Sequence, residues 1–127
     1  MKVLIADDDR QLCQFLNLAL REYGWDVVAA FDALQALMMA KKCIPDAIVL
    51  DIHMPCGTGI GALEKLSMNM ETSMIPILIL SGSQDPAIED RAKALGAVGY
   101  LHKPVDIEEL HQCLLKITRA YSKSISD

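Results

Sequence analysis

Five short apolar runs recur along the chain, separated by segments that have the periodicity of amphipathic helices. The runs are Val3–Ala6, Val27–Ala30, Ala47–Leu50, Ile75–Leu80 and Val98–Leu101. Four of them are nearly continuous Val, Ile, Leu or Ala, which is typical of strands buried on both faces of a parallel sheet.

The intervening segments predict five helices. The first would bury one apolar face, made of Leu12, Phe15, Leu16 and Leu20. The second, Ala33–Lys42, would bury Leu34, Leu37 and Met38, and Ile44–Pro45 would end it. The other three are expected at Ile60–Met68, Pro86–Leu95 and Ile107–Ala120. Gly24 and Gly96 are placed to stop the helices before them.

Strand and helix alternate five times, which predicts a doubly wound α/β fold with a flavodoxin-like three-layer sandwich. Right-handed crossovers leave few topologies, and five strands favour the order 2-1-3-4-5. We expect a single domain over residues 1–120. Residues 121–127 would form a frayed tail or the start of a linker.

Composition narrows the class of protein. The chain has 127 residues and a net charge of −5, without a stripe of Lys or Arg, so we expect no direct nucleic-acid binding. The start MKVLIADDD does not read as a signal peptide, and no apolar run approaches the roughly twenty residues of a membrane span. We therefore expect a soluble, cytoplasmic protein. Its cysteines form no CxxC pair and would be buried or half-buried thiols: Cys13, Cys43, Cys56 and Cys113.

Polar side chains follow four of the predicted strands. Asp7, Asp8 and Asp9 follow the first, and Asp51 follows the third. The fourth ends at Ser81, and the fifth is followed by His102 and Lys103. Ligands of open α/β sheets bind outside the carboxyl ends of the strands, so these groups should converge there. Clustered carboxylates favour a hard cation such as Mg²⁺, and a carboxylate can itself accept a phosphoryl group.

Four motifs in this order resemble the receiver domains of bacterial two-component response regulators: VLIADDD, IVLDIHMPCGTG, ILILSGS and GYLHKP. The resemblance covers nearly the whole chain. It implies that Asp51 is the phosphoacceptor, that Asp8 binds Mg²⁺ directly and that Asp7 does so through water. It further implies a Mg²⁺ ligand in the backbone carbonyl of His53 and contacts to the phosphoryl group from Ser81 and Lys103. Ser81 and Tyr100 would form the switch, and Pro104 would follow a cis peptide bond.

The resemblance also implies partners. A sensor histidine kinase or a histidine phosphotransfer protein would donate the phosphoryl group. The fourth helix, fifth strand and fifth helix, carrying Arg91, Tyr100 and Gln112, would form the output face toward a downstream domain or protein. Phosphorylation could also drive homodimerisation through such a face. The domain would promote its own phosphorylation and hydrolysis, so we do not class it as an enzyme.

Two positions depart from the family pattern. Thr58 stands where members often carry Asp before the glycine, here Gly59, and Thr is a competent helix cap. The side chain of His53 could lean over the phosphoryl group, which bears on the lifetime of the phosphorylated state.

Other functions fit these residues less well. A phosphohydrolase with an aspartate nucleophile usually needs an acid at the position of His53 and a cap domain, for which 127 residues leave no room. A degenerate receiver that only binds proteins would not need the intact set of site residues. His53, Cys56, His102 and His111 match no common zinc spacing. Asp9 is expected to point away or cap a helix, and Met68, Met70 and Met74 to fill core gaps rather than form a binding surface.

Overall fold

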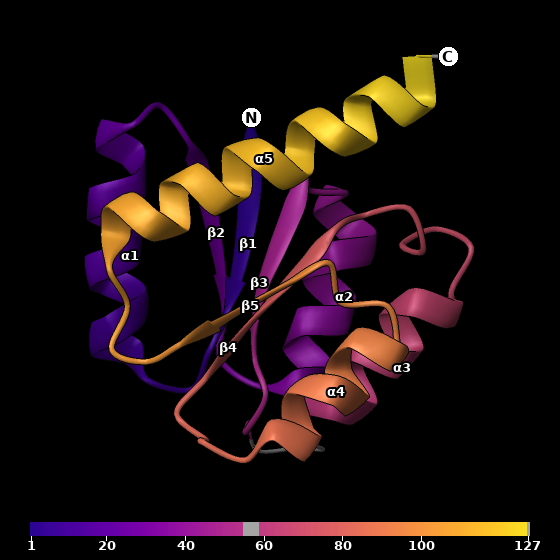
Figure 1. Cartoon of the computed structure of the whole chain (residues 1–127). Helices are drawn as coiled ribbons and strands as arrows, with labels where there is room; N and C mark the ends of the chain where they lie inside the picture. Colours follow the sequence, from indigo (N-terminus) through magenta and orange to yellow (C-terminus); the bar gives the residue numbers. More distant parts are fainter. Residues whose placement is uncertain (55–58, 127) are drawn as a thin grey trace.

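The structure, a computed structural model, describes residues 1–54 and 59–126, and side chains as far as residue 120 (Figure 1). Its strands are β1 (Lys2–Ala6), β2 (Asp26–Ala30), β3 (Ala47–Asp51), β4 (Ile77–Ser81) and β5 (Gly99–His102). Its helices are α1 (Arg10–Glu22), α2 (Ala33–Cys43), α3 (Gly59–Met68), α4 (Pro86–Ala94) and α5 (Ile107–Ser126). The predicted alternation of strands and helices is confirmed.

All five strands are parallel, in the order β2-β1-β3-β4-β5, which confirms the predicted topology. Ala6, the last residue of β1, pairs with Leu50 of β3. The next residue along each chain segment is an aspartate, so Asp7 and Asp51 lie side by side at the same edge of the sheet. Ser81 pairs with His102, which brings the ends of β4 and β5 level. Every helix begins just past the carboxyl end of a strand and runs back along the sheet.

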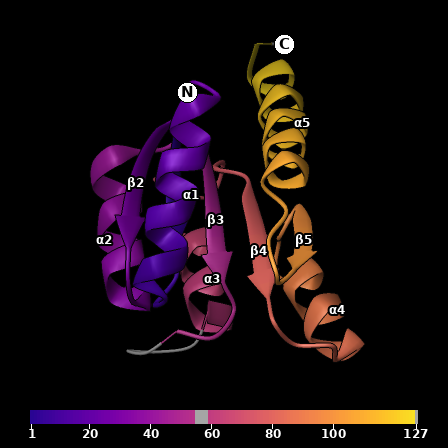
Figure 2. The ribbon, with the colours of Figure 1, turned by 90° about the vertical axis from the view of Figure 1, so that its left-hand side faces the viewer.

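Helices cover both faces of the sheet (Figures 1 and 2). α1 and α5 pack on one face, over the strand residues Val3, Ile5 and Val49. α2, α3 and α4 pack on the other, over residues such as Leu4 and Ile48. Successive residues of each central strand therefore enter different cores, which is why these strands are apolar throughout.

The predicted buried face of α2 is wrong for Leu34 and Met38, whereas Leu37 is half-buried and packs against the core. Leu34 and Met38 are 59% and 62% exposed, and the residues buried against the sheet are Ala33, Ala36 and Ala40. Small side chains let the helix lie close to the sheet, and the longer ones then point outward. In α1, likewise, Phe15 is 50% exposed, whereas Leu16 and Leu20 are buried as expected.

The three methionines near the end of α3 do not fill the core. Met68, Met70 and Met74 are 77%, 94% and 58% exposed, so the gap-filling interpretation is wrong. Met68 is the last residue of α3, and Met70 and Met74 lie between α3 and β4. Three of the cysteines are buried or half-buried as expected, and Cys56 lies outside the described residues.

Helix ends follow their sequence signals. Asp9, Asp32 and Asp85 cap α1, α2 and α4 by accepting hydrogen bonds from backbone N–H groups of the first turn. Gly24 and Gly96 adopt φ values of +94° and +111°, which confirms that they follow the ends of α1 and α4. α5 continues to Ser126, past the predicted end at Ala120. Within the described residues, no helix is long and apolar enough to span a membrane.

Candidate functional site

Three carboxylates meet at the carboxyl edge of the sheet. Asp7 and Asp8 follow β1, and Asp51 is the last residue of the neighbouring β3. Ligand oxygens of the three side chains lie within 4.8 Å of one another. Asp7 and Asp51 are buried, whereas Asp8 is exposed, so the cluster opens to solvent on the side of Asp8.

Lys103, just after β5, supplies a positive charge to this cluster. Its Nζ lies 2.8 Å from Oδ2 of Asp7 and 3.6 Å from Oδ1 of Asp51. Burial lowers the pKa of Lys103, but the hydrogen bonds and charges of Asp7 and Asp51 outweigh burial and raise it. The ammonium is therefore held in its charged form between two acids. The peptide bond to Pro104 is cis, as expected.

The carboxylate of Asp51 is only 4% exposed. Burial raises its pKa, the charge of Asp7 adds to this effect, and Lys103 opposes it. Oδ1 accepts a hydrogen bond of 3.3 Å from the backbone N–H of His53. The ionised form of Asp51 thus lacks enough positive charge nearby, and a bound cation would relieve that shortage.

Backbone packing fixes the position of Asp51. The N–H of Gly59, the first residue of α3, donates to the carbonyl of Ile52 at 2.9 Å. A Cβ at Gly59 would overlap the carbonyl oxygen of Asp51 and lie 2.5 Å from Cα of Ile52. Only glycine lets α3 start this close to the end of β3. Thr58, the predicted cap, lies outside the described residues.

Ser81 ends β4 beside Asp51 in the sheet order, and it is fully buried. Its Oγ accepts a 3.0 Å hydrogen bond from the N–H of Ser83. The hydroxyl hydrogen remains able to donate to a group arriving at Asp51. The predicted site residues that follow β1, β3, β4 and β5 therefore lie at one edge of the sheet.

The three-carboxylate cluster fits a hard divalent cation. All three side chains offer oxygen atoms, the ligands that Mg²⁺ prefers. Oδ2 of Asp7 is buried, and its partner is the ammonium of Lys103 at 2.8 Å. The metal-capable group found among the described residues contains only aspartates, without His or Cys. This composition favours Mg²⁺ over zinc.

Tyr100 on β5 lies half-buried against the core formed with α4. Its hydroxyl is buried and has no hydrogen-bond partner among the described residues. The ring contacts His102 edge-on at 5.3 Å between centroids, and Nε2 of His102 lies 3.7 Å from Glu89 of α4. Arg91 and Gln112, expected on the same face, are exposed.

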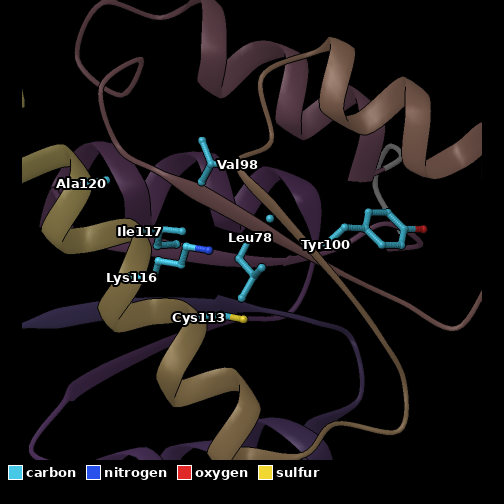
Figure 3. A pocket seen from close by; sticks show the side chains of 8 residues that line it. Leu78, Val98, Tyr100, Cys113, Lys116, Ile117 and Ala120 are labelled. Atoms are coloured by element: carbon cyan, nitrogen blue, oxygen red, sulfur yellow. The ribbon is translucent and has the colours of Figure 1, made fainter.

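A cavity of about 440 Å³ lies between α5 and strands β4 and β5. Figure 3 shows Cys113 and Lys116 extending from α5 toward Leu78, while the ring of Tyr100 points away from α5. The cavity is thus separate from the acid cluster, although Tyr100 borders it.

Two side-chain contacts join residues that no sequence pattern pairs. Trp25 donates from Nε1 to Nδ1 of His111 at 3.0 Å, in the core below α5. Arg10 lies over the ring of Phe31, with Cζ 4.0 Å from its centroid. Neither pair has a sequence motif, because each joins elements that only the sheet order brings together.

Comparisons with known proteins agree with this geometry. Residues 3–115 match the family model described as response regulator receiver domain. Transcriptional regulatory protein TctD of Salmonella typhimurium is 36% identical over 121 residues, which cover 94% of this chain and 52% of the relative. Transcriptional regulatory protein PrrA of Mycobacterium tuberculosis is 38% identical over 111 residues, 86% of this chain and 46% of the relative. The chain thus spans about half the length of these curated relatives.

Solved structures share the fold. Chemotaxis protein CheY4 of Vibrio cholerae superposes with a TM-score of 0.85 at 34% identity, covering 91% of this chain and 96% of that one. A CheY-like receiver domain from Methanospirillum hungatei JF-1 reaches 0.91 at 22% identity, covering 97% of both chains. The latter likeness concerns the fold alone.

Proposed function

This chain belongs to the response regulator receiver domain family of two-component systems, and from that premise we propose that Asp51 is its phosphoacceptor. One observation carries the proposal. Asp51 is a buried carboxylate with a raised pKa, at the end of a central strand, beside both a lysine and two further acids. Burying such a carboxylate costs free energy. Carboxylates with pKa values raised in this way occur mainly at functional sites.

In this proposal the chain's own residues assist the transfer. A carboxylate oxygen of Asp51 attacks the phosphorus of a phosphohistidine, and the bond from phosphorus to nitrogen breaks toward the imidazole. The ammonium of Lys103 lies where it can pair with a phosphoryl oxygen, and the Ser81 hydroxyl can donate to another. The same groups would assist later hydrolysis by water. The family as a whole serves as a phosphoacceptor rather than as a classical enzyme.

Mg²⁺ is the proposed cofactor. The carboxylates of Asp8 and Asp51 and the backbone carbonyl of His53 would hold it, with Asp7 reached through water. When bound, the ion supplies positive charge to the phosphoryl oxygens. The exposed position of Asp8 and the two bonded oxygens of Asp7 support these different roles.

Phosphorylation would act on Tyr100 through Ser81. Drawing the Ser81 hydroxyl toward the phosphoryl group would move the loop between β4 and α4, and Tyr100 packs against the core that includes Ala92 of α4. The Tyr100 hydroxyl is buried in this structure. Phosphorylation would therefore increase the population of molecules with a buried Tyr100 rather than create a new conformation. The face of α4, β5 and α5 would then change its affinity for partners.

We infer the partners from this cycle. A sensor histidine kinase or a histidine phosphotransfer protein would supply the phosphoryl group in the cytoplasm. The curated relatives are transcriptional regulators about twice as long. An output domain or protein, or a second phosphorylated copy, would therefore receive the signal through the α4–β5–α5 face. The domain itself would not contact nucleic acid.

The test is chemical labelling. Incubation with acetyl phosphate and Mg²⁺ should add one base-labile phosphoryl group, measured by intact mass spectrometry. Asp51→Asn should remain unlabelled, whereas Asp90→Asn, an exposed aspartate on α4, should be labelled like the wild type. Equal labelling of Asp51→Asn would show that another residue accepts the phosphoryl group.

A further inference from the structure

Arg10 lies at the carboxyl edge of the sheet, on the side of β2, two residues along the chain from Asp8. It begins α1 directly after the three aspartates that follow β1, and Phe31 directly follows β2. Because β1 and β2 are neighbours in the sheet, the two side chains meet, with the Arg10 Cζ 4.0 Å above the ring centroid of Phe31. The guanidinium is thereby held at the carboxyl edge of the sheet.

Phe31 forms a fixed platform for this guanidinium. Its ring is half-buried against the core beneath α1, and its backbone N–H donates to Oε1 of Gln35 at 2.7 Å. Stacking on an aromatic ring uses only the flat face of a guanidinium. The N–H donors of Arg10 lie in the plane of that group, so they stay available to an anion.

Nearby acids do not neutralise Arg10. Within the part of the chain that the structure describes, Arg10 is in no ion pair. The carboxylates of Asp9 and Asp32 accept hydrogen bonds from the backbones of α1 and α2, where they act as caps. Lys103, in contrast, is bound to the acid cluster itself. Arg10 is therefore an exposed cation with unused donors beside an acidic site.

We propose that Arg10 determines phosphodonor specificity, by favouring donors that carry two negative charges. This inference rests on the proposed role of Asp51. A doubly charged donor is repelled by the three carboxylates as it approaches, and a cation at the same edge of the sheet offsets part of that repulsion. A donor with a single net negative charge is repelled less and benefits less. The interaction crosses solvent, so salt above about 0.1 M screens it.

The reaction balances without any further reactant. With acetyl phosphate, an oxygen of Asp51 bonds to phosphorus, the bond from phosphorus to the acetyl oxygen breaks, and acetate leaves with the electron pair. With phosphoramidate, the bond from phosphorus to nitrogen breaks, and the nitrogen, already protonated, leaves as ammonia. Arg10 takes part in neither bond change. It acts on the association of the donor with the site, so its effect should appear in the phosphorylation rate at low donor concentration.

The experiment measures phosphorylation rates of the full chain with Mg²⁺, using acetyl phosphate as the dianion and phosphoramidate as the monoanion. At low ionic strength, Arg10→Gln should slow reaction with acetyl phosphate by about two- to fivefold. A whole cleft of one charge raises association rates by about tenfold or more, and a single cation should contribute less. Arg10→Lys should keep most of the wild-type rate. Arg119→Gln, which removes the same charge about three turns along α5, is the matched control and should react like the wild type.

The pattern across donors and salt decides the matter. A loss with acetyl phosphate that exceeds the loss with phosphoramidate, and that fades in high salt, supports the proposal. An unchanged rate, or an equal and salt-independent loss with both donors, overturns the role of Arg10 while labelling of wild-type Asp51 stands. If the wild type takes no phosphoryl group at Asp51, the proposed function fails and this inference fails with it.

Discussion

The Nζ atom of Lys103 lies 2.8 Å from Oδ2 of Asp7, a carboxylate that is itself fully buried. This pairing leaves Asp51 with the longer contact to the same ammonium, at 3.6 Å. One lysine thus faces two buried acids, and it does not compensate both. Because burial dominates at Asp51, its pKa is raised above the ordinary 3.8.

Asp51→Asn should therefore stabilise the metal-free protein at pH 7. The native state holds the Asp51 proton more tightly than the unfolded chain, so this contribution to stability is present below pH 3.8 and lost as the pH rises through the raised pKa. Removing the buried charge should increase the free energy of unfolding by about 1–3 kcal/mol. Urea denaturation at several pH values, with Asp90→Asn as control, would measure it. A gain that persists below pH 3.8 would contradict this origin.

Mg²⁺ affinity should depend more on Asp8 than on Asp7. Asp8 is exposed, whereas both carboxylate oxygens of Asp7 already have partners. Oδ1 accepts a hydrogen bond from the backbone N–H of Asp9, and Oδ2 lies 2.8 Å from Nζ of Lys103. Calorimetric titration should show that Asp8→Ala lowers the Mg²⁺ affinity by about tenfold or more. Changing a residue that only hydrogen-bonds a metal ligand already costs about tenfold, and Asp8 is proposed as a direct ligand. Asp9→Asn, which can still cap α1, should bind Mg²⁺ nearly as the wild type does. Equal affinity of Asp8→Ala and wild type would remove Asp8 from the site.

Gly59→Ala should destabilise the protein and displace Asp51. The added methyl group would overlap the backbone of Asp51 and Ile52, so α3 or the end of β3 must shift. We expect a cost of about 1–3 kcal/mol in thermal or urea unfolding, together with slower phosphorylation. Gly82→Ala is the control, because no atom lies within 4 Å of a Cβ placed there. Similar unfolding curves for the two variants would show that the close approach is not limiting.

Ser81→Ala should separate phosphorylation from its effect on Tyr100. The variant keeps Asp51, Lys103 and the metal-binding carboxylates, so labelling should persist at a reduced rate. NMR spectra with and without beryllofluoride, a phosphoryl mimic, should show shifts at Tyr100 and α4 in the wild type but only around Asp51 in the variant. Wild-type shifts confined to the loops around Asp51 would argue against the switch.

Trp25→Phe should lower stability without affecting phosphorylation. The indole N–H donates to Nδ1 of His111 at 3.0 Å in a buried setting, and phenylalanine would leave that nitrogen without a partner. The expected cost is about 1–3 kcal/mol in urea unfolding. Tyr23→Phe, which retains the ring stacked on His111 at 3.9 Å, should change stability by less than about 0.5 kcal/mol. A loss in Trp25→Phe no larger than that in Tyr23→Phe would show that this hydrogen bond contributes little to stability.

The sequence predicted the strands well because the central strands β1, β3 and β4 are buried on both faces. An apolar run such as Ala47–Leu50 is then unambiguous, and the polar residue after it marks the site. The helices were harder. For α2, the largest apolar residues were assumed to face inward, but the spacing of Ala33, Ala36 and Ala40 was the better signal. Contacts such as Arg10 with Phe31 depend on strand neighbours and have no local signal.

All five helices begin at the edge that holds the acid cluster, and this shared direction has an electrostatic consequence. The peptide dipoles of a helix place roughly half a positive charge at its amino-terminal end. The positive end of α1 directly follows Asp7, Asp8 and Asp9, and α3 starts in contact with the backbone that carries Asp51. A phosphoryl group on Asp51 would add negative charge to this region and favour the first turns nearest to it. Phosphorylation would therefore act on the fold through a field as well as through individual hydrogen bonds.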